Sequence, residues 1–409
     1  MNSNVYLLGG FQTDFIRNWA REKKHISAMM REVYEGSLVA TKIKPKDIQA
    51  AFVGNFAAEL YCMQGHLGAF FIEFDPVFKG LPTCRYEAAC ASSSVAALSA
   101  MAHIQAGMYD CIAVVGVEQM KTVDAAKGGD FLGTAAWYER ESAGVEFPFP
   151  KLFGRLGDEY EARFGLKNEY LARIAEINYA NARRNPNAQT RDWYMNYEHA
   201  CSTGQYNPLV VGRIKITDCS QITDGAAILY LASEKFAAGY AARCGISLDK
   251  LPRILGWGNT TAPMEFAAKI HDSQNDPYVL PWTRKAITDA MKRADLESCW
   301  QLSAIETHDC FTTSEYMAID HFGLTEPGKS WQAIEQGTIE IGGKLPINPS
   351  GGLIGCGHPV GATGARQLLD AYKQCTNTAG DYQVAGAKRV ATLNIGGSAT
   401  TNVVFIIGG

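Results

Sequence analysis

The sequence lacks any apolar run that approaches the roughly 18 to 20 residues needed to cross a bilayer. It also lacks an excess of charge of either sign, because 38 Lys and Arg residues stand against 42 Asp and Glu residues, for a formal net charge of −4. The basic residues are dispersed along the chain. We therefore expect a protein that binds neither nucleic acid nor a membrane.

Cysteine pairs with the Cys-x-x-Cys spacing are also absent, and no group of Cys and His residues has the spacing of a zinc site. The eleven cysteines are scattered singly, so for each of them a small buried hydrophobic side chain is the first interpretation. We expect no metal ion. The first residues lead directly into a strand-like run, and the last residues carry no retention or peroxisomal tripeptide, so we expect a cytoplasmic location.

Short apolar runs rich in β-branched residues alternate with helical stretches along the chain. Runs of this length suit strands that are buried on both faces, so we expect an α/β fold. The expected strands are 5–9, 50–54, 111–118 and 228–232 in a first set, and 253–256, 304–307, 390–395 and 402–407 in a second set.

The two sets of strands resemble each other in sequence, which indicates two related halves rather than a solenoid of short repeats. We place the first half at residues 1–245 and the second at residues 246–409, joined near residues 235–252. The segments that resemble each other are 5–10 and 253–258, 51–56 and 304–309, and 111–116 and 389–394.

Residues 119–215 interrupt this alternation and are rich in aromatic residues, Gly, Asn and Arg. An insertion of this length in a compact domain is usually functional, for example as a substrate lid or an interface. A small packing subdomain is the alternative, and the sequence alone does not separate the two interpretations.

Cys90 stands at the turn into a helix made almost entirely of Ala and Ser, which Gly107 is expected to close. A helix with small residues on every side is expected to pack between other layers. At its N-terminus the free backbone N–H groups and the helix dipole favour a thiolate, so we expect the reactive fraction of Cys90 to be raised. A buried cysteine at the start of a core helix is the alternative interpretation.

His358 lies in a segment, residues 348–366, that contains six glycines. This density of glycine indicates that the backbone comes close to a neighbouring group. A single histidine is more often a core residue than a catalyst, but here the pattern Gly-His-Pro-x-Gly-Ala holds it by a proline and by tight turns before a helix. Beside a cysteine, such a histidine is suited to take the thiol proton.

Two further candidate segments follow expected strands. His308 and Cys310 come directly after the strand at 304–307, where ligands and catalytic groups of an α/β sheet collect. Gly396 follows the strand at 390–395, where glycines leave backbone N–H groups free to face an oxyanion. A core cysteine beside a strand-end histidine, and a plain turn, are the alternatives.

Together, these four segments resemble the thiolase family, in its order and with its spacing. Residues 218–227 also look like the segment that closes the first half in this family, and the resemblance covers essentially the whole chain, more loosely over 119–210. It implies a layered α-β-α-β-α fold built from two similar halves with an inserted loop domain. It also implies an acyl-coenzyme A thioester as substrate, no separate cofactor, and a homodimer or homotetramer.

The chain departs from most thiolases at two positions. Its final loop reads Asn394-Ile395-Gly396 where biosynthetic and degradative thiolases have Cys-x-Gly, and His308-Asp309-Cys310-Phe311 stands where many have Asn-Glu-Ala-Phe. Both features are similar to the sterol-carrier-protein type of thiolase. The roles that this resemblance implies are Cys90 as nucleophile, His358 as its base, Cys310 rather than Cys356 or Cys219 as the second catalytic cysteine, His308 with His358 near the enolate, and the N–H groups of Cys90 and Gly396 as oxyanion donors.

Three alternatives stay open. The first keeps the enzyme class but has an aromatic or polyketide acceptor and a small accessory subunit, and the aromatic residues of 131–206 favour it mildly. The second is a ketoacyl synthase of the related condensing enzymes, which Cys310 disfavours because those enzymes do not need this thiol. The third is a non-catalytic scaffold subunit, which would be expected to have lost Cys90 or His358.

Overall fold

The computed structural model describes residues 4–409. Nine strands form one continuous mixed sheet in the order β3-β2-β4-β7-β1-β8-β11-β10-β9, and a two-stranded hairpin of β5 and β6 lies apart from it. The strands are β1 (Val5–Gln12), β2 (Ala50–Gly54), β3 (Thr83–Tyr86), β4 (Cys111–Glu118), β5 (Leu209–Val211), β6 (Ile214–Lys215), β7 (Gly225–Ser233), β8 (Arg253–Thr261), β9 (Ala304–Glu306), β10 (Arg389–Gly396) and β11 (Thr401–Gly408). All eight predicted strands are present, whereas the short edge strand β3 was not predicted.

The order of four strands repeats across the large sheet. The sequence β2-β4-β7-β1 in the first half corresponds to β9-β10-β11-β8 in the second. In each half the first two strands are parallel and the other neighbours are antiparallel. One residue pairing, Tyr6 with Arg253, links β1 to β8 and so joins the halves. The predicted α/β fold of two similar halves is confirmed, and the exact boundary at residue 245 stays a prediction.

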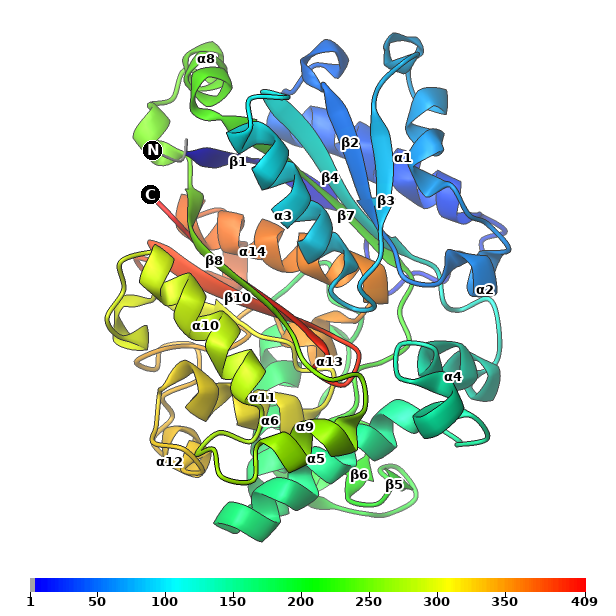
Figure 1. The fold of residues 1–409 in the computed structure, drawn as a ribbon, viewed down its shortest axis with the longest axis vertical. Coiled ribbons are helices and arrows are strands. Elements are labelled where there is room, and N and C mark those ends of the chain that lie inside the picture. Colours follow the sequence, from blue (N-terminus) through cyan, green and yellow to red (C-terminus); the bar gives the residue numbers. More distant parts are fainter. Residues whose placement is uncertain (1–3) are drawn as a thin grey trace.

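Helices cover both halves of the sheet and also fill the space between them (Figure 1). Helix α1 (Ile26–Thr41) packs on β1 and β7, whereas α10 (Pro281–Arg293) packs on β8 and β11. Between the two halves lie α3 (Ser92–Gln105), which packs on β2 and β4, and α14 (Thr363–Thr376), which contacts α3 and strands of both halves. These contacts define the predicted α-β-α-β-α layers.

The remaining helices cover the outer faces or belong to the inserted segment. They are α2 (Ala58–Cys62), α4 (Ala125–Gly133), α5 (Pro148–Phe164), α6 (Asn168–Ala182), α7 (Tyr197–Cys201), α8 (Glu234–Cys244), α9 (Phe266–Asp272), α11 (Thr312–Phe322), α12 (Ser330–Glu335) and α13 (Gly352–Cys356).

The core is divided into clusters that match these layers. Alternate residues of β4 show the division, because Ala113 and Val115 pack with the cluster under α1, whereas Ile112 and Val114 pack with the cluster that contains α3 and α14. A strand with both faces buried therefore reads as a continuous apolar run. The hydrophobic character of β4 follows directly from its place between two helical layers.

The inserted segment lies between β4 and β7 and is mainly helical. In the second half, the corresponding connection between β10 and β11 is only a short turn at residues 397–400. Helices α5 and α6 contribute buried residues to the core cluster of the second half, so the segment packs as part of the domain. The predicted insertion is present as a packed, mainly helical segment.

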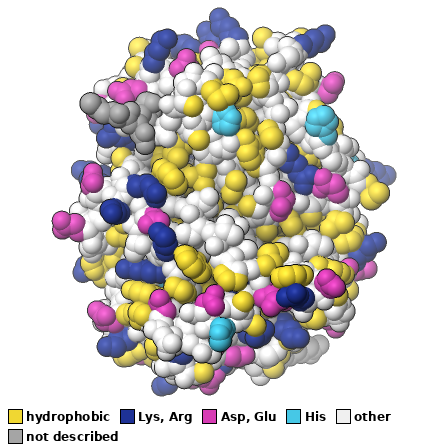
Figure 2. Space-filling view, viewed as in Figure 1, with side chains coloured by type: hydrophobic (Ala, Val, Ile, Leu, Met, Phe, Trp, Pro, Cys, Tyr) yellow, Lys and Arg dark blue, Asp and Glu magenta, His cyan; other side chains and the backbone are white. Residues whose placement is uncertain are grey.

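On the face shown in Figure 2, acidic and basic side chains are interspersed, and hydrophobic side chains gather across the middle. Among residues 4–409, none of the helices combines the length and the apolar character that crossing a bilayer requires.

Helix α10 lies unusually close to β8. A Cβ atom on Gly258 would overlap the carbonyl oxygen of Ala286, and one on Gly256 would overlap that of Ala290. The two glycines share one face of the strand, and the two alanines are one helical turn apart. Small residues on both elements therefore set the distance between the sheet and its outer helix.

We predict that Gly258→Ala lowers stability by about 1 to 3 kcal/mol, because the added methyl group must displace the backbone of α10. The matched control is Gly239→Ala in the exposed part of α8, where a Cβ atom meets nothing within 4 Å. There the change is expected to stabilise by about 0.5 to 1 kcal/mol, as Ala replaces Gly in a helix. Thermal melting of both variants tests this, and equal melting temperatures would contradict the close-packing account.

Candidate active site

Cys90 lies in the tight turn between β3 and α3, one residue before the N-cap residue Ala91. The preceding residue, Ala89, has a φ of 50°, a left-handed conformation that is uncommon for residues other than glycine. Glu87 stabilises this turn, because its carboxylate accepts a hydrogen bond from the N–H of Ala89 at 2.5 Å. The turn brings the thiol of Cys90 to the wall of a cavity.

His358 follows α13 and precedes α14, as the glycine-rich pattern predicted. Its Nδ1 lies 2.7 Å from Oγ1 of Thr363, whose hydroxyl donates to the carbonyl of Pro359 at 3.2 Å. Because that hydroxyl has only one hydrogen and the carbonyl of Pro359 accepts it, we assign the donor at Nδ1 to His358, which leaves Nε2 unprotonated. This tautomer has the lone pair that a general base needs.

The glycines around His358 allow close approach to other segments. A Cβ atom on Gly361 would lie 2.6 Å from the Cα of Asn55, and one on Gly352 would overlap the carboxylate of Asp309. Asp309 accepts hydrogen bonds from the N–H groups of Leu353 and Ile354 at 2.6 and 3.1 Å. The segment that carries His358 is thereby fixed to the segment that carries His308 and Cys310.

Glu118, at the end of β4, is a buried anchor that the sequence pattern did not reveal. Its carboxylate accepts hydrogen bonds from the N–H groups of Phe56, Ala57 and Gly361 at 2.9, 3.2 and 2.9 Å. Burial raises its pKa to about 7, although these hydrogen bonds favour the ionised form. A single side chain thus ties the loop of His358 to the first half of the sheet.

The predicted catalytic residues meet at one place. The Sγ of Cys90 and one ring nitrogen each of His308 and His358 lie within 4.8 Å of one another. The two imidazole rings are 5.1 Å apart between centroids and nearly perpendicular, at 85°. Cys310 lines the same cavity, and its Sγ lies 3.9 Å from Oγ of Ser314. Residues from three separate segments therefore form one cluster.

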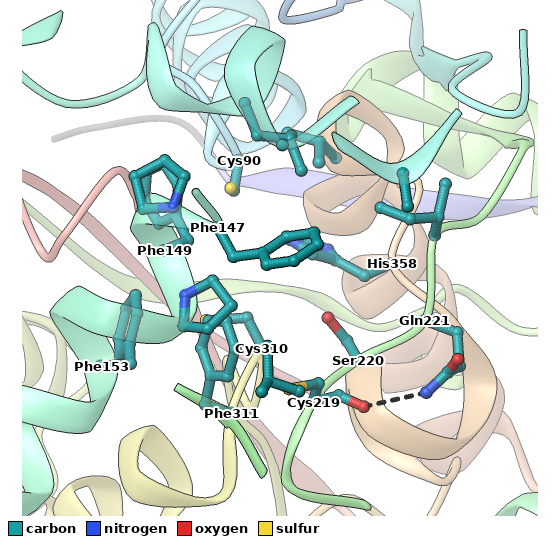
Figure 3. Close-up of a pocket in the computed structure, with 18 of the residues that line it drawn as sticks. Cys90, Phe147, Phe149, Phe153, Cys219, Ser220, Gln221, Cys310, Phe311 and His358 are labelled. Carbon is teal, nitrogen blue, oxygen red and sulfur yellow. Dashed lines mark hydrogen bonds between the residues drawn. The ribbon is translucent and has the colours of Figure 1, made fainter. Parts of the chain in front are cut away.

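The cavity that these residues share has a volume of about 500 Å³. Figure 3 shows Cys90, Cys310 and His358 around it, with Phe149 and Phe153 at its side. Most of its apolar wall comes from the inserted segment, through Ala125, Leu132, Phe147, Phe149, Phe153, Leu209 and Val210. The insertion therefore shapes the space beyond the nucleophile.

Burial dominates the electrostatics of the cluster. It raises the pKa of the Cys90 thiol to about 12, and hydrogen bonding from the N–H of Gly397 opposes this shift only in part. It raises the pKa of Cys310 well above the usual range and lowers that of His358 to about 3. The pKa of His308 also lies well below its usual range, because of burial first and then His358 and Arg366. The thiols and imidazoles of the cluster are therefore neutral.

The expectation that the helix terminus would enrich the thiolate of Cys90 is wrong. Helix α3 begins at Ser92, two residues beyond the cysteine, and Cys90 is only 9% exposed. The loss of hydration outweighs the helix N-terminus, so the proton of Cys90 has to be removed when substrate is bound.

The final glycine loop contributes two glycines with different surroundings. Gly397 lines the cavity, and its N–H is directed at Cys90. Gly396 ends β10, and a Cβ atom there would overlap the carbonyl oxygen of Ala88, so this position requires close backbone contact. The oxyanion role predicted for Gly396 stays a prediction, and Gly397 is a second candidate that the sequence analysis did not name.

The comparisons with known proteins agree with this geometry. Residues 5–192 match the family described as Thiolase, N-terminal domain, and residues 266–409 match Thiolase C-terminal domain-like. The chain is 31% identical to an acetyl-CoA acetyltransferase of Methanothermobacter thermautotrophicus, over 98% of this chain and 99% of that protein. It is 27% identical to human sterol carrier protein 2, over 99% of this chain and 72% of that protein.

Solved structures show the same fold. The human mitochondrial 3-ketoacyl-CoA thiolase superposes with a TM-score of 0.71 at 16% identity, covering 100% of this chain and 99% of that one. The Ltp2-ChsH2(DUF35) aldolase superposes with a TM-score of 0.76 at 16% identity, covering 99% and 98%. The chain belongs to the thiolase family, as the sequence predicted. It is a thiolase-type acyltransferase.

Because the pKa of Cys90 is raised, the rate of its alkylation should depend on pH. We expect the rate of iodoacetamide modification at Cys90 to rise continuously from about pH 6 to about pH 9, because the thiolate fraction of a thiol with a raised pKa grows over this range. Peptide mass mapping measures the rate, with the exposed Cys84 as the internal reference. A rate at Cys90 that is constant from about pH 6 to about pH 8 would instead indicate a preformed thiolate–imidazolium pair.

Proposed function

We propose that the cavity takes an acyl-coenzyme A thioester and that the protein makes or breaks a carbon–carbon bond through an acyl-Cys90 intermediate. The observation that carries this proposal is the meeting of Cys90, His308 and His358 within 4.8 Å in the cavity that Cys310 also lines. No separate cofactor or metal is needed for this chemistry, since both cysteines and both histidines act through protons and hydrogen bonds.

The first stage is transfer of the acyl group to the enzyme. The Sγ of Cys90 attacks the thioester carbonyl carbon while its proton passes to Nε2 of His358. Coenzyme A then leaves as a thiolate and takes this proton from His358. The oxyanion of the tetrahedral intermediate is directed to the backbone N–H groups of Cys90 and of the Gly396–Gly397 loop.

The second stage forms the carbon–carbon bond. Cys310 passes its proton to Nε2 of His358, and its thiolate then removes an α-proton from the acceptor. The resulting carbanion attacks the acyl carbon and releases the Cys90 thiolate, which takes the proton from His358. In the degradative direction, Cys310 protonates the departing enolate. The enolate oxygen is stabilised between His308 and the ring of His358 that carries the proton from Cys310, and the two rings are nearly perpendicular, at 85°.

The positions of the other cysteines support Cys310 as the second catalytic cysteine. The thiol of Cys219 also lies at the cavity but is engaged with the carbonyl of Lys215 at 3.3 Å. Cys356 is fully buried and receives a hydrogen bond from Asn185 at 3.6 Å. Among these three cysteines, only Cys310 both lines the cavity and has a pKa that is raised by the nearby Cys90.

The cysteines of this cavity give a direct test of the proposal. Cys90→Ala is expected to abolish acyl-enzyme formation, because the attacking atom is lost, whereas Cys310→Ala should keep acylation and lose carbon–carbon bond exchange. Cys219→Ala is the matched control and should keep both. Intact-mass analysis after incubation with acetyl-coenzyme A measures acylation, and acetoacetyl-coenzyme A thiolysis measures exchange. Acylation of Cys90→Ala, or an unmodified wild type, would refute the proposal.

A second candidate is a C-acyltransferase whose acyl group or acceptor is bulky. The largely apolar wall that the inserted segment places beside Cys90 favours it. A dedicated enzyme of this kind should cleave acetoacetyl-coenzyme A poorly, which distinguishes it from an acetyl-transferring thiolase.

The lining of the cavity gives a further prediction, on substrate preference. Ala125 lines the cavity mouth, whereas its neighbour Ala126 is exposed and does not line it. We expect Ala125→Trp to lower acylation by a bulky acyl-coenzyme A roughly 10-fold or more relative to acetyl-coenzyme A, because the indole occupies the mouth. Ala126→Trp should leave the ratio unchanged, and equal ratios in the two variants would contradict this path for the acyl chain.

Assembly and location belong to the same proposal. A homodimer or homotetramer is expected from the family resemblance. One structural neighbour, the Ltp2-ChsH2(DUF35) aldolase, joins Ltp2 to a DUF35 protein, which supports a small accessory subunit as a further partner. We also propose a cytoplasmic location.

A further inference from the structure

His308 has one ring nitrogen without a hydrogen-bond partner. Among the described residues 4–409, no group bonds to its Nε2, although the side chain is fully buried. A buried polar atom without a partner is rare in folded proteins and calls for an explanation. This atom belongs to one of the two imidazoles that face each other at the cavity. Nε2 of His308 is therefore the free position from which this ring can interact with a substrate.

The other nitrogen of His308 is occupied by Asn394. The side-chain amide of Asn394 lies with Nδ2 3.2 Å from Nδ1 of His308. An amide nitrogen only donates, so Nδ1 has to accept and the single proton of a neutral imidazole lies on Nε2. The pKa of His308 lies well below its usual range, mainly because of burial, so the neutral form is the relevant one.

Ser94 fixes which way the amide of Asn394 points. The hydroxyl of Ser94 donates to Oδ1 of Asn394 at 2.8 Å, which leaves Nδ2 for His308. If the amide were reversed, the Ser94 hydroxyl would lose this acceptor. The space around the pair is also closed, because a Cβ atom on Gly364 would overlap Oγ of Ser94 and lie 2.6 Å from Oδ1 of Asn394.

We propose that Asn394, oriented by Ser94, is a positioning residue that holds His308 as an Nε2–H donor for the enolate oxygen of the acceptor. The inference rests on the proposed function, since the enolate is the species that this donor serves. It also gives the asparagine of the final loop a task other than that of the cysteine found there in most thiolases. At rest His358 is in the opposite state, with its lone pair on Nε2, so the two neighbouring imidazoles supply one donor and one acceptor.

The same arrangement disfavours a metal ion at this cluster. Cys90, His308 and His358 have ligand atoms within 4.8 Å of one another, which is close enough to suggest a site for a thiophilic cation. Histidines that bind metal almost always donate their other ring N–H to an acceptor. His308 does the reverse, because its other nitrogen accepts from Asn394. Because Nδ1 of His308 accepts this hydrogen bond, the ring proton lies on Nε2, and His308 cannot serve as the third ligand.

Asn394→Asp tests the proposal with almost no change in shape. A carboxylate keeps the bond from Ser94 but accepts from Nδ1–H, so a neutral His308 loses its donor at Nε2. We expect carbon–carbon bond exchange at about pH 8 to fall roughly 10²- to 10³-fold, the usual effect of losing one oxyanion donor, while acylation of Cys90 is retained. Asn394→Ala and Ser94→Ala leave either tautomer accessible and should lose less.

The pH profile separates this role from a structural one. The carboxylate of Asn394→Asp favours the imidazolium, whose Nε2 again carries a proton, so exchange should recover as the pH falls. The groups that act on His308 are His358, Arg366, Cys90 and the chain neighbours Asp309 and Cys310, and all of them are unchanged in the variant. Wild type and Asn394→Ala should show no such recovery.

A second readout does not require activity. Asn394→Asp should bind Zn²⁺ about 10- to 100-fold more tightly than wild type in competition with a chromogenic chelator, because His308 then offers a lone pair. If the wild type is not acylated, the proposed function fails, but zinc affinity still reports the tautomer. An Asn394→Asp variant that matches Asn394→Ala in exchange, pH profile and zinc affinity would overturn the inference.

Discussion

The site depends on the close approach of two helices in the middle layer. Helix α3 begins two residues after Cys90 and belongs to the first half, whereas α14 follows His358 and belongs to the second. Small residues allow the contact, since the N–H of Ala365 bonds to Oγ of Ser93 at 2.9 Å and Gly364 leaves room for Ser94. With larger side chains at these positions, the nucleophile and its base would be separated. The Ala- and Ser-rich sequence of α3 is therefore a requirement of the chemistry as well as of the packing.

Buried hydrogen bonds then fix the loops that this contact brings together. Glu118 connects the loop of His358 to β4, and Asp309 connects it to the segment of His308 and Cys310. Both acids are fully buried and accept backbone N–H groups, so their partners cannot move without leaving a buried carboxylate unpaired. The catalytic groups are preorganised in this way, and their neutral resting state follows from the same burial. Substrate binding has to supply the conditions under which Cys90 transfers its proton to His358.

Much of the fold was predictable because both faces of each half-sheet are covered. Strands such as β4 read as continuous apolar runs, and the resemblance between the two strand sets reflects the repeated strand order. The edge strand β3 was missed because its residues are half-exposed and carry no such pattern. The helices of the insertion were also not predicted. Its aromatic residues pack against the second half and also line the cavity, so they do not mark a single buried helix face.

The site was predictable to a similar extent, and for a different reason. Cys90, His358, His308 and Cys310 stand in short motifs at strand ends or helix starts, and these are visible in the sequence. Glu118 and the Asn394–Ser94 pair act through contacts between segments far apart in the chain, for which one sequence has no local signal. Thr363 is close to His358 in the chain, but no pattern marks its hydroxyl as the partner of the ring. The ionisation of Cys90 could not be predicted either, because it depends on burial by the complete fold.

The most direct test of the account is a crystal structure of the protein soaked with an acyl-coenzyme A. The account predicts an acyl group on Sγ of Cys90, with its carbonyl oxygen toward the N–H groups of Cys90 and the Gly396–Gly397 loop. It further predicts that the acceptor position lies between Cys310 and Nε2 of His308. A thioester bound elsewhere, or an acyl group on another cysteine, would contradict the account.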